Sequence, residues 1–454
     1  MGRACGINND IARSLRASDT TTDTTAGDSP RPFQSNRTEH HPSSGKAAIV
    51  YVSRLALDHY RSWERLVVDF TPGVNVLHGA NGLGKTNIVE AVEVLSTGTS
   101  HRTSSSLPLI ERGEAKATIR ANVVDETCGG TRVTTYEATV AARGANRARV
   151  DSGPSRYLRD IVGEVPSVAF TPDDQRLVSA DPATRRTFLD QAGALLVPRY
   201  AQRLQQFTRI ARQRAALLKQ LGAREGSYDA AISGLEVWTG QFIDAGLELT
   251  HVRDGIVSRL AAPFAAIYAR LASGRGEAGL AYAPSFAEIL DAPDAHDPRP
   301  AIAAHFQRLY AGEVARGVNL IGPQRDDLTV TLDGAPAREF ASNGEMWTMA
   351  LALKMALYET VAEDRGVKPV VILDDVFAQL DESRRRQILD FALDQEQVLV
   401  TVAATGDIPD IPTSAQAREV SIIDVEELAR AYGGADGPDG AAAGDVGGET
   451  GSMR

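Results

Sequence analysis

The chain contains the segment Gly79-Ala80-Asn81-Gly82-Leu83-Gly84-Lys85-Thr86, which fits Gly-x-x-x-x-Gly-Lys-[Ser/Thr], the pattern of a phosphate-binding loop. Glycines allow successive backbone N–H groups to face phosphate oxygens, Lys85 reaches the β and γ phosphates, and the Thr86 hydroxyl binds Mg²⁺. We therefore expect every residue of this segment to contact a nucleotide, Lys85 to be catalytic and Thr86 to be a metal ligand. The alternative is a simple glycine-rich turn.

The sequence on both sides of this loop favours nucleotide binding. Val74–Leu77 is typical of a short buried strand, and the spacing of apolar residues after Thr86 predicts a helix. These apolar residues are Ile88, Val89, Ala91, Val92, Val94 and Leu95. Such a helix directs the positive end of its dipole at bound phosphates. A strand, a loop and a helix in this order predict an ATP site.

A second segment predicts the acidic half of the site. The short apolar run Val370-Val371-Ile372-Leu373 ends in Asp374 and Asp375. In phosphate-loop enzymes the first acidic group after such a strand helps to hold Mg²⁺, and a following carboxylate orients or deprotonates the attacking water. We assign Asp374 to the metal and Asp375 to catalysis. The alternative is a strand followed by a polar turn.

A third segment precedes a long predicted helix. Ser342-Asn343-Gly344-Glu345 opens a run of helical periodicity that extends to about Glu363, and Leu380-Asp381 follows the acidic strand. Ser-x-x-Glu before a helix is also the pattern of a capping box, which satisfies backbone N–H groups and needs no ligand. Both interpretations of this segment stay open at this point.

These pieces, in this order, resemble the ABC-type ATPases. In that family a signature segment, Ser-x-Gly-Glu/Gln, contacts the γ phosphate of ATP held by a second subunit. The resemblance implies that ATP joins two copies of the chain as a homodimer, and it implies nucleotide contacts for Ser342, Gly344, Glu345 and Asp381. It also implies one for Arg61, just after the first strand, where related ATPases use a basic residue. For Arg61 a surface hairpin is the alternative.

Further segments, spread over nearly all of residues 50 to 410, are similar to the RecF family. They are Leu57-Asp58-His59-Tyr60-Arg61-Ser62-Trp63, Gly84-Lys85-Thr86-Asn87-Ile88-Val89-Glu90-Ala91, Ser100-His101-Arg102, Phe170-Thr171-Pro172-Asp173-Asp174, Arg185-Arg186-Thr187-Phe188-Leu189-Asp190 and Gly322-Pro323-Gln324-Arg325-Asp326-Asp327-Leu328. This resemblance implies a cytoplasmic, nucleoid-associated protein of DNA repair and replication that binds single-stranded, gapped or junction DNA. It also implies work with RecO and RecR to promote RecA loading and SOS induction.

The chain departs from the family pattern at several positions. Gln324 stands where the family usually has His, Asn343 and Met346 replace glutamines around the signature, and Trp347 replaces a frequent Arg. Asp375 replaces the glutamate that is usual in transporters, and Ala403 follows a strand after which many ABC ATPases carry a histidine. Because a shorter carboxylate holds water farther from the γ phosphate, we expect slow, DNA-stimulated hydrolysis, with ATP acting as a dimerisation switch.

The composition limits the class of protein. A length of 454 residues allows two or three domains, and a net charge of -11 argues against a generally basic, histone-like binder while leaving room for local basic patches. The sequence contains no run of about 18 apolar residues, so it predicts no membrane-spanning helix, and we expect no membrane partner. The two cysteines, Cys5 and Cys128, give no disulfide framework.

The pattern along the chain predicts an α/β fold: an ABC-type P-loop ATPase head with an antiparallel β section and an inserted helical arm domain. We assign 49–182 and 315–431 to the head and 183–314 to the arm, and we expect the polar ends 1–48 and 432–454 to be disordered. Because no methionine lies between Met1 and Met346, we expect translation to start near Val50 from a non-AUG codon.

A near-heptad apolar stripe in the arm predicts a short antiparallel helix pair. It comprises Tyr200, Leu204, Phe207, Ala211, Leu218 and Leu221, with Arg214 interrupting it at an apolar position. Basic residues are dense here, and they form either a solvated helix face or a surface that follows DNA phosphates. Arg203 and Arg212 of this surface, and Arg102 near the phosphate loop, are candidate DNA contacts.

Two other classes of ATPase share the nucleotide motifs. The ATPase subunit of an ABC-type transporter is usually shorter and carries a coupling surface for a membrane partner. An SMC or Rad50-like structural ATPase has a far longer coiled coil than residues 183–314 can form. Both stay as alternatives to the RecF-like interpretation.

Overall fold

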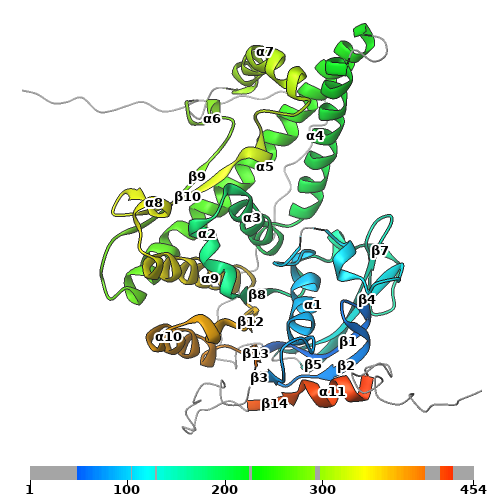
Figure 1. The fold of residues 1–454 in the computed structure, drawn as a ribbon, viewed down its shortest axis with the longest axis vertical. Coiled ribbons are helices and arrows are strands. Elements are labelled where there is room, and N and C mark those ends of the chain that lie inside the picture. The colour runs from blue at the N-terminus through cyan, green and yellow to red at the C-terminus, as the bar shows by residue number, and fades with distance from the viewer. Residues whose placement is uncertain are drawn as a thin grey trace, which may run out of the picture. The chain divides into compact units, whose positions relative to one another are not determined.

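The computed structural model describes residues 49–103, 105–127, 130–223, 228–291, 297–403 and 420–432 (Figure 1). The predictions made for residues 1–48 lie outside the described residues, as do those for the tail beyond Tyr432. Among the described residues, no helix is both long and apolar enough to cross a membrane.

The first sheet of the described chain is antiparallel. Its order is β2-β1-β4-β5-β6-β7, and each strand runs antiparallel to its neighbours. The strands are β1 (Ile49–Tyr60), β2 (Trp63–Asp69), β4 (Lys116–Thr127), β5 (Gly130–Ala141), β6 (Arg147–Val150) and β7 (Arg156–Tyr157). The antiparallel β section that the sequence predicted is confirmed, and it includes the long pair β4 and β5.

The second sheet is parallel and carries the nucleotide motifs. Its order is β14-β3-β13-β12-β8, with parallel pairing throughout. The strands are β3 (Gly73–His78), β8 (Ser167–Phe170), β12 (Val370–Asp374), β13 (Gln397–Val402) and β14 (Val420–Asp424). Every residue of β8, β12 and β13 is buried, which explains their continuous apolar runs, since parallel strands are covered on both faces.

Helix α1 (Lys85–Thr97) lies beside both sheets (Figure 1). Its apolar residues share one hydrophobic core with β1, β2 and β4 of the antiparallel sheet and with β12 and β13 of the parallel sheet. The helix ends at Gly98, whose left-handed backbone terminates it. Because α1 is held from both sides, the loop that precedes it has a fixed position relative to β12.

Long helices follow in the middle of the chain. They are α3 (Pro182–Leu196), α4 (Tyr200–Ala223), α5 (Tyr228–Leu271) and α7 (Arg299–Arg316). Helix α4 packs on α5, as the stripe predicted, and α5 continues far enough to pack on α9 (Asn343–Arg365). The inserted helices and α9 therefore belong to one hydrophobic core that also reaches β12 and β13.

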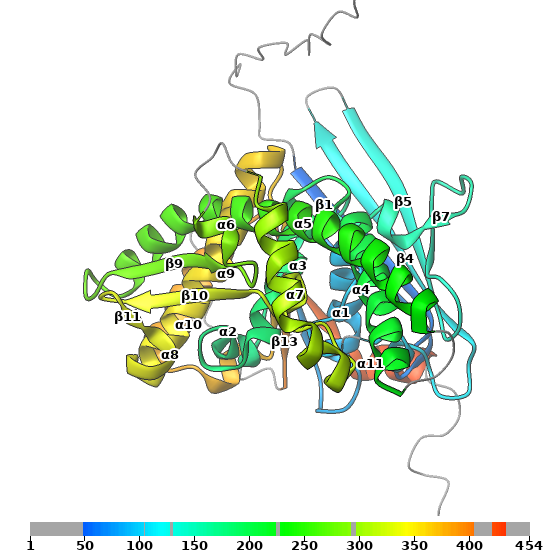
Figure 2. The ribbon, with the colours of Figure 1, turned by 90° about the horizontal axis from the view of Figure 1, so that it is seen from above.

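A small sheet, β11-β10-β9, lies beside these helices (Figure 2). It consists of β9 (Ala278–Ala283), β10 (Asp327–Leu332) and β11 (Ala335–Pro336). Strand β9 lies within the section that the sequence predicted as mostly helical, and its partner β10 lies in the next section. The two sections are therefore joined by a sheet as well as by the α5–α9 contact.

Shorter elements complete the description. The short helices are α2 (Arg176–Ser179), α6 (Glu288–Asp291), α8 (Ala337–Phe340), α10 (Glu382–Leu393) and α11 (Val425–Tyr432). Single 3₁₀ turns occur at Leu107–Leu109, Leu158–Asp160, Pro172–Gln175, Pro323–Arg325 and Val376–Gln379.

The arginine that interrupts the apolar stripe of α4 is buried in an ion pair. Arg214 donates to both carboxylate oxygens of Glu313 on α7, at 3.0 and 2.6 Å, and its side chain is 2% exposed. It also donates to Asn319 at 2.8 Å and to the Thr239 hydroxyl of α5 at 2.9 Å. Its guanidinium lies 4.4 Å from the ring centre of Phe306. One buried cation therefore ties α4, α5 and α7 together.

Candidate nucleotide-binding site

The phosphate-binding loop connects β3 to α1, as the sequence predicted. Gly84 directly precedes the helix and has a positive φ of 89°. Trp63 on β2 covers this turn, and its indole Nε1 donates to the Gly84 carbonyl at 3.2 Å. A Cβ atom on Gly84 would lie 2.7 Å from that indole nitrogen. Only glycine fits here, because both the backbone conformation and the contact with Trp63 exclude a side chain.

Lys85 closes the loop on itself. Its ammonium donates to the carbonyls of Gly79 at 2.6 Å and Ala80 at 2.9 Å. Burial lowers the pKa of Lys85, whereas the nearby charges of Asp375 and Asp374 act in the opposite direction. The lysine therefore lies among the groups that the sequence assigned to the same site.

The two predicted metal ligands are in contact. The Thr86 hydroxyl donates to Asp374 Oδ1 at 2.9 Å, and Asp374 is 4% exposed. Thr401 at the end of β13 donates to the same oxygen at 2.7 Å. A hydroxyl and a carboxylate oxygen at the edge of a phosphate-binding loop are ligands that Mg²⁺ accepts, together with phosphate oxygens and water. The residues present therefore fit this ion.

Asp375 follows at the point where the chain leaves β12. Its backbone is left-handed, with φ 51°, and its N–H donates to the Thr401 hydroxyl at 2.9 Å. The turn brings Asp375 near enough for its charge to act on Lys85. Two adjacent strand residues would face opposite sides of the sheet, and the left-handed turn removes that restriction.

Arg61 faces helix α1. It lies between β1 and β2, and its guanidinium forms a bidentate ion pair with Glu90, with Nε 2.8 Å from Oε2 and Nη2 bonded to Oε1. Glu90 is fully buried. A nucleotide contact for Arg61 remains a prediction. In this structure its Nε and Nη2 are both bonded to Glu90.

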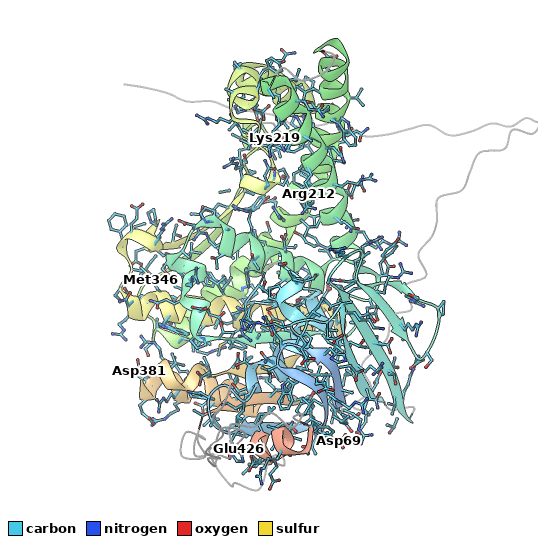
Figure 3. The ribbon with its side chains drawn as sticks, turned by 45° about the vertical axis from the view of Figure 1, so that its right-hand side comes forward. Asp69, Arg212, Lys219, Met346, Asp381 and Glu426 are labelled. Carbon is cyan, nitrogen blue, oxygen red and sulfur yellow. The ribbon has the colours of Figure 1, made fainter. Side chains whose placement is uncertain are left out.

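The signature segment lines a pocket that does not include Lys85, Thr86 or Asp374. Ser342 caps α9 in a capping box: Glu345 N–H donates to Ser342 Oγ at 3.3 Å, and the Glu345 carboxylate accepts from Ser342 N at 2.7 Å. Ser342, Gly344, Glu345 and Asp381 line one pocket of about 400 Å³. Figure 3 places Met346 of α9 and Asp381 on the same side of the molecule. The capping box is present, and its residues Ser342 and Glu345 line this pocket.

For His101 the sequence left open a nucleotide or partner contact and a surface turn, and the structure places it beside Asp374. Its Nδ1 bonds to Glu93 of α1 at 2.6 Å, and its Nε2 lies 3.8 Å from Asp374 Oδ2. Burial alone would lower the pKa of His101, but the hydrogen bond and charge of Glu93, with the charges of Asp374 and Glu90, raise it. The signal was available, because Glu90 and Glu93 interrupt the apolar face of α1 at i, i+3 spacing and a buried carboxylate needs a partner.

Glu426 lies beside the phosphate-binding loop, although the sequence did not assign it to the site. It is in the first turn of α11, and its Oε1 accepts from the backbone N–H of Ala80 at 3.4 Å. The contact arises because β14 pairs with β3, so the helix after β14 begins beside the loop after β3. No local pattern in the sequence indicates that pairing.

Comparison with known proteins identifies the family. The model of the RecF/RecN/SMC N-terminal domain matches residues 51–411. A protein from Bifidobacterium longum subsp. infantis, the DNA replication and repair protein RecF, is 65% identical over 383 residues, which cover 82% of this chain and 92% of that protein. The chain belongs to the RecF family.

Other RecF proteins extend this comparison. The RecF of Bifidobacterium adolescentis is also 65% identical, over 84% of this chain and 92% of its own length. A solved structure of the recombination mediator protein RecF with ATP superposes with a TM-score of 0.70 at 24% identity, covering 82% of this chain and 96% of that one. A second solved structure, of RecF with ATPrS, superposes with a TM-score of 0.71 at 23% identity and covers 83% of this chain and 98% of that one. This chain therefore has the α/β ATPase fold of those RecF structures.

Proposed function

We propose that this RecF-family chain is an ATP-binding protein of DNA replication and repair, in which ATP controls the joining of two copies on DNA. The observation that carries the proposal is the division of the predicted site into two groups. Lys85, Thr86 and Asp374 meet at the edge of the parallel sheet, whereas Ser342 and Asp381 line a separate pocket. Relatives at 65% identity are DNA replication and repair proteins.

The first group supplies the binding half of the site. Lys85 binds the β and γ phosphates, the loop N–H groups surround them, and Thr86 with Asp374 holds Mg²⁺. Bound there, the ion would neutralise negative charge on the phosphates. Asp375 orients the attacking water. Because this carboxylate is short, hydrolysis is slow, with a turnover number below ~10 s⁻¹, the median for enzymes.

The second group completes the site of another copy. The α9 N-terminus presents backbone N–H groups of Asn343 and Gly344 to a terminal phosphate, and a helix N-terminus favours an anion. ATP closes the dimer only as far as it binds the closed state more tightly than the open one. Hydrolysis or product release then reopens it, so that ATP times the lifetime of the dimer on DNA.

The DNA contacts are mostly to phosphates. Arg212 of α4 lines two adjoining pockets. Arg159 and Arg209 line one of them with it, and Arg186 lines the other. Arg203 already pairs with Glu248 at 2.7 Å, which makes it the weaker candidate. In the RecF pathway this protein acts on single-stranded, gapped or junction DNA with RecO and RecR, and it promotes RecA loading and SOS induction at the nucleoid. A phosphate-dominated interface gives a steep decrease of affinity with salt.

Sedimentation of the wild type and of Ser342→Arg, with ATP, with ADP and without nucleotide, tests the dimer. The wild type is expected to dimerise with ATP alone, and Ser342→Arg is expected to bind ATP and stay monomeric. Lys85→Ala is expected to lose ATP binding itself. A wild type that remains monomeric in saturating ATP and Mg²⁺ contradicts the proposal, and so does an affinity for gapped DNA that does not change with salt.

A further inference from the structure

The pocket at the signature segment contains two arginines that the ATPase motifs do not assign. It is lined by Arg275, Ser342, Gly344, Glu345, Asp381 and Arg384, among others. Arg275 follows helix α5, and Arg384 lies in the first turn of α10. Both cations therefore lie on the surface that Ser342 and Gly344 share with Asp381.

The signature side chains leave little donor capacity for an anion. The Ser342 hydroxyl bonds to the Glu345 carboxylate at 2.7 Å, and that carboxylate also accepts the Ser342 N–H. The hydrogen bonds with Ser342 lower the pKa of Glu345, so it stays ionised at neutral pH. With Asp381, two carboxylates line a pocket that is expected to receive a phosphate. A cation must balance them, because an unbalanced pair would repel the ligand.

Arg384 packs directly on the signature glycine. Its Nη2 donates to the Gly344 carbonyl at 3.0 Å, and its Nη1 pairs with Asp381. A Cβ atom at Gly344 would lie 2.6 Å from Nη2, so the glycine is what allows the guanidinium to lie this close to the helix N-terminus. Its Nε is buried and has no hydrogen-bond partner among the described residues.

We propose that Arg384 binds the terminal phosphate of ATP carried by a second copy of this chain, with Arg275 as the second cation of the pocket. The inference rests on the proposed ATP-dependent dimer. Arginine suits this role because its planar fork makes two parallel hydrogen bonds to a phosphate, and it does not deprotonate. Asp381 holds the guanidinium against the signature until the phosphate replaces it. ADP, which lacks that phosphate, leaves the pair intact.

A purely structural role for Arg384 predicts a different outcome. The Arg384–Asp381 pair is an i, i+3 pair with partly exposed side chains, and such pairs contribute little to stability. The same helix provides a matched control, since Arg386 forms an exposed i, i+4 pair with Glu382 at 3.3 Å and is not among the residues lining the pocket. Loss of either ion pair alone should affect folding little, although Arg384→Gln also removes the hydrogen bond to the Gly344 carbonyl, and only Arg384 should affect dimerisation.

The experiment compares the wild type, Arg384→Gln, Arg384→Lys and Arg386→Gln by sedimentation with ATP or ADP, with ATP affinity measured on dilute monomers. Arg384→Gln should weaken the ATP-dependent dimer by about tenfold or more, since a hydrogen bond to a charged group contributes about 1.5–3 kcal/mol. Arg384→Lys should fall between it and the wild type. Monomer ATP affinity should match that of Arg386→Gln, and both monomers should stay folded at the temperature of the runs.

Three outcomes overturn this inference. They are dimerisation of Arg384→Gln at wild-type strength, a loss of ATP affinity in its monomer, and an equal weakening of the dimer by Arg386→Gln. A wild type that fails to dimerise would instead refute the proposed function. The two failures are therefore distinguishable in one set of runs.

Discussion

The buried ion pair of the arm gives the sharpest prediction about stability. Replacement of Arg214 by Met leaves Glu313, whose side chain is fully buried, without its cation. Breaking a buried pair by removing one partner costs about 3–5 kcal/mol, because the remaining charge is uncompensated. This is a large part of a total stability of about 5–15 kcal/mol. Arg214→Met should therefore lower the free energy of unfolding by at least about 3 kcal/mol.

Urea unfolding, followed by circular dichroism, measures this difference against two comparison variants. Arg212→Met, on the exposed face of the same helix, should stay within about 0.5 kcal/mol of the wild type. Arg214→Met combined with Glu313→Gln should recover more than half of the loss, because the orphan charge is gone and the amide oxygen still accepts from Leu320 N–H. A loss well below about 3 kcal/mol for Arg214→Met, or no recovery in the double variant, refutes the reasoning.

Three further predictions concern the head. Gly84→Ala should reduce both stability and ATP affinity more than Gly82→Ala does. Both glycines have positive φ, but only a Cβ atom at Gly84 would meet other atoms. Equal effects of the two substitutions in urea unfolding and ATP titration would contradict this. Lys354→Met should cost about 1–3 kcal/mol in urea unfolding, since it leaves the buried Asp174 without its cation 3.3 Å away. The pKa of His59 is raised by its hydrogen bond to a glutamate, so its contribution to stability is present below about pH 6.5 and is lost as the pH rises through the raised value. His59→Gln should therefore melt below the wild type near pH 6 and approach it at high pH, and a constant gap would count against the assignment.

The local motifs of the nucleotide site could be predicted from the sequence because each is a complete physical unit. The strand before the loop, the loop and helix α1 follow from hydrophobic periodicity and glycine spacing. The run that ends at Asp374 is apolar because β12 is buried on both faces. The capping box of α9 is readable from Ser342 and Glu345 alone. In each case the residues that decide the structure are neighbours in the chain.

The remaining parts depend on contacts between distant residues. In the sequence Arg214 only interrupts the apolar stripe of α4, because its partner, Glu313, lies 99 positions away in the chain. His101 reads as a surface turn until α1 places Glu93 beside it. The sequence predicts a helical arm over 183–314 and does not indicate β9, because the strand that pairs with it, β10, follows much later in the chain. Periodicity reports which face of an element is buried, and it does not report what covers that face.

Parallel pairing of β14 with β3 has a consequence for how the protein is made. Neighbouring strands of this sheet are separated by more than three hundred residues, from Gly73–His78 to Val420–Asp424. At about 5–20 residues per second, a ribosome needs roughly 20–70 s to synthesise that interval. During this time the edges of β3 are unpaired and open to wrong partners. The first strands of the nascent chain must therefore avoid aggregation during this time. A fragment stalled on the ribosome before β14 is made should be unable to retain ATP.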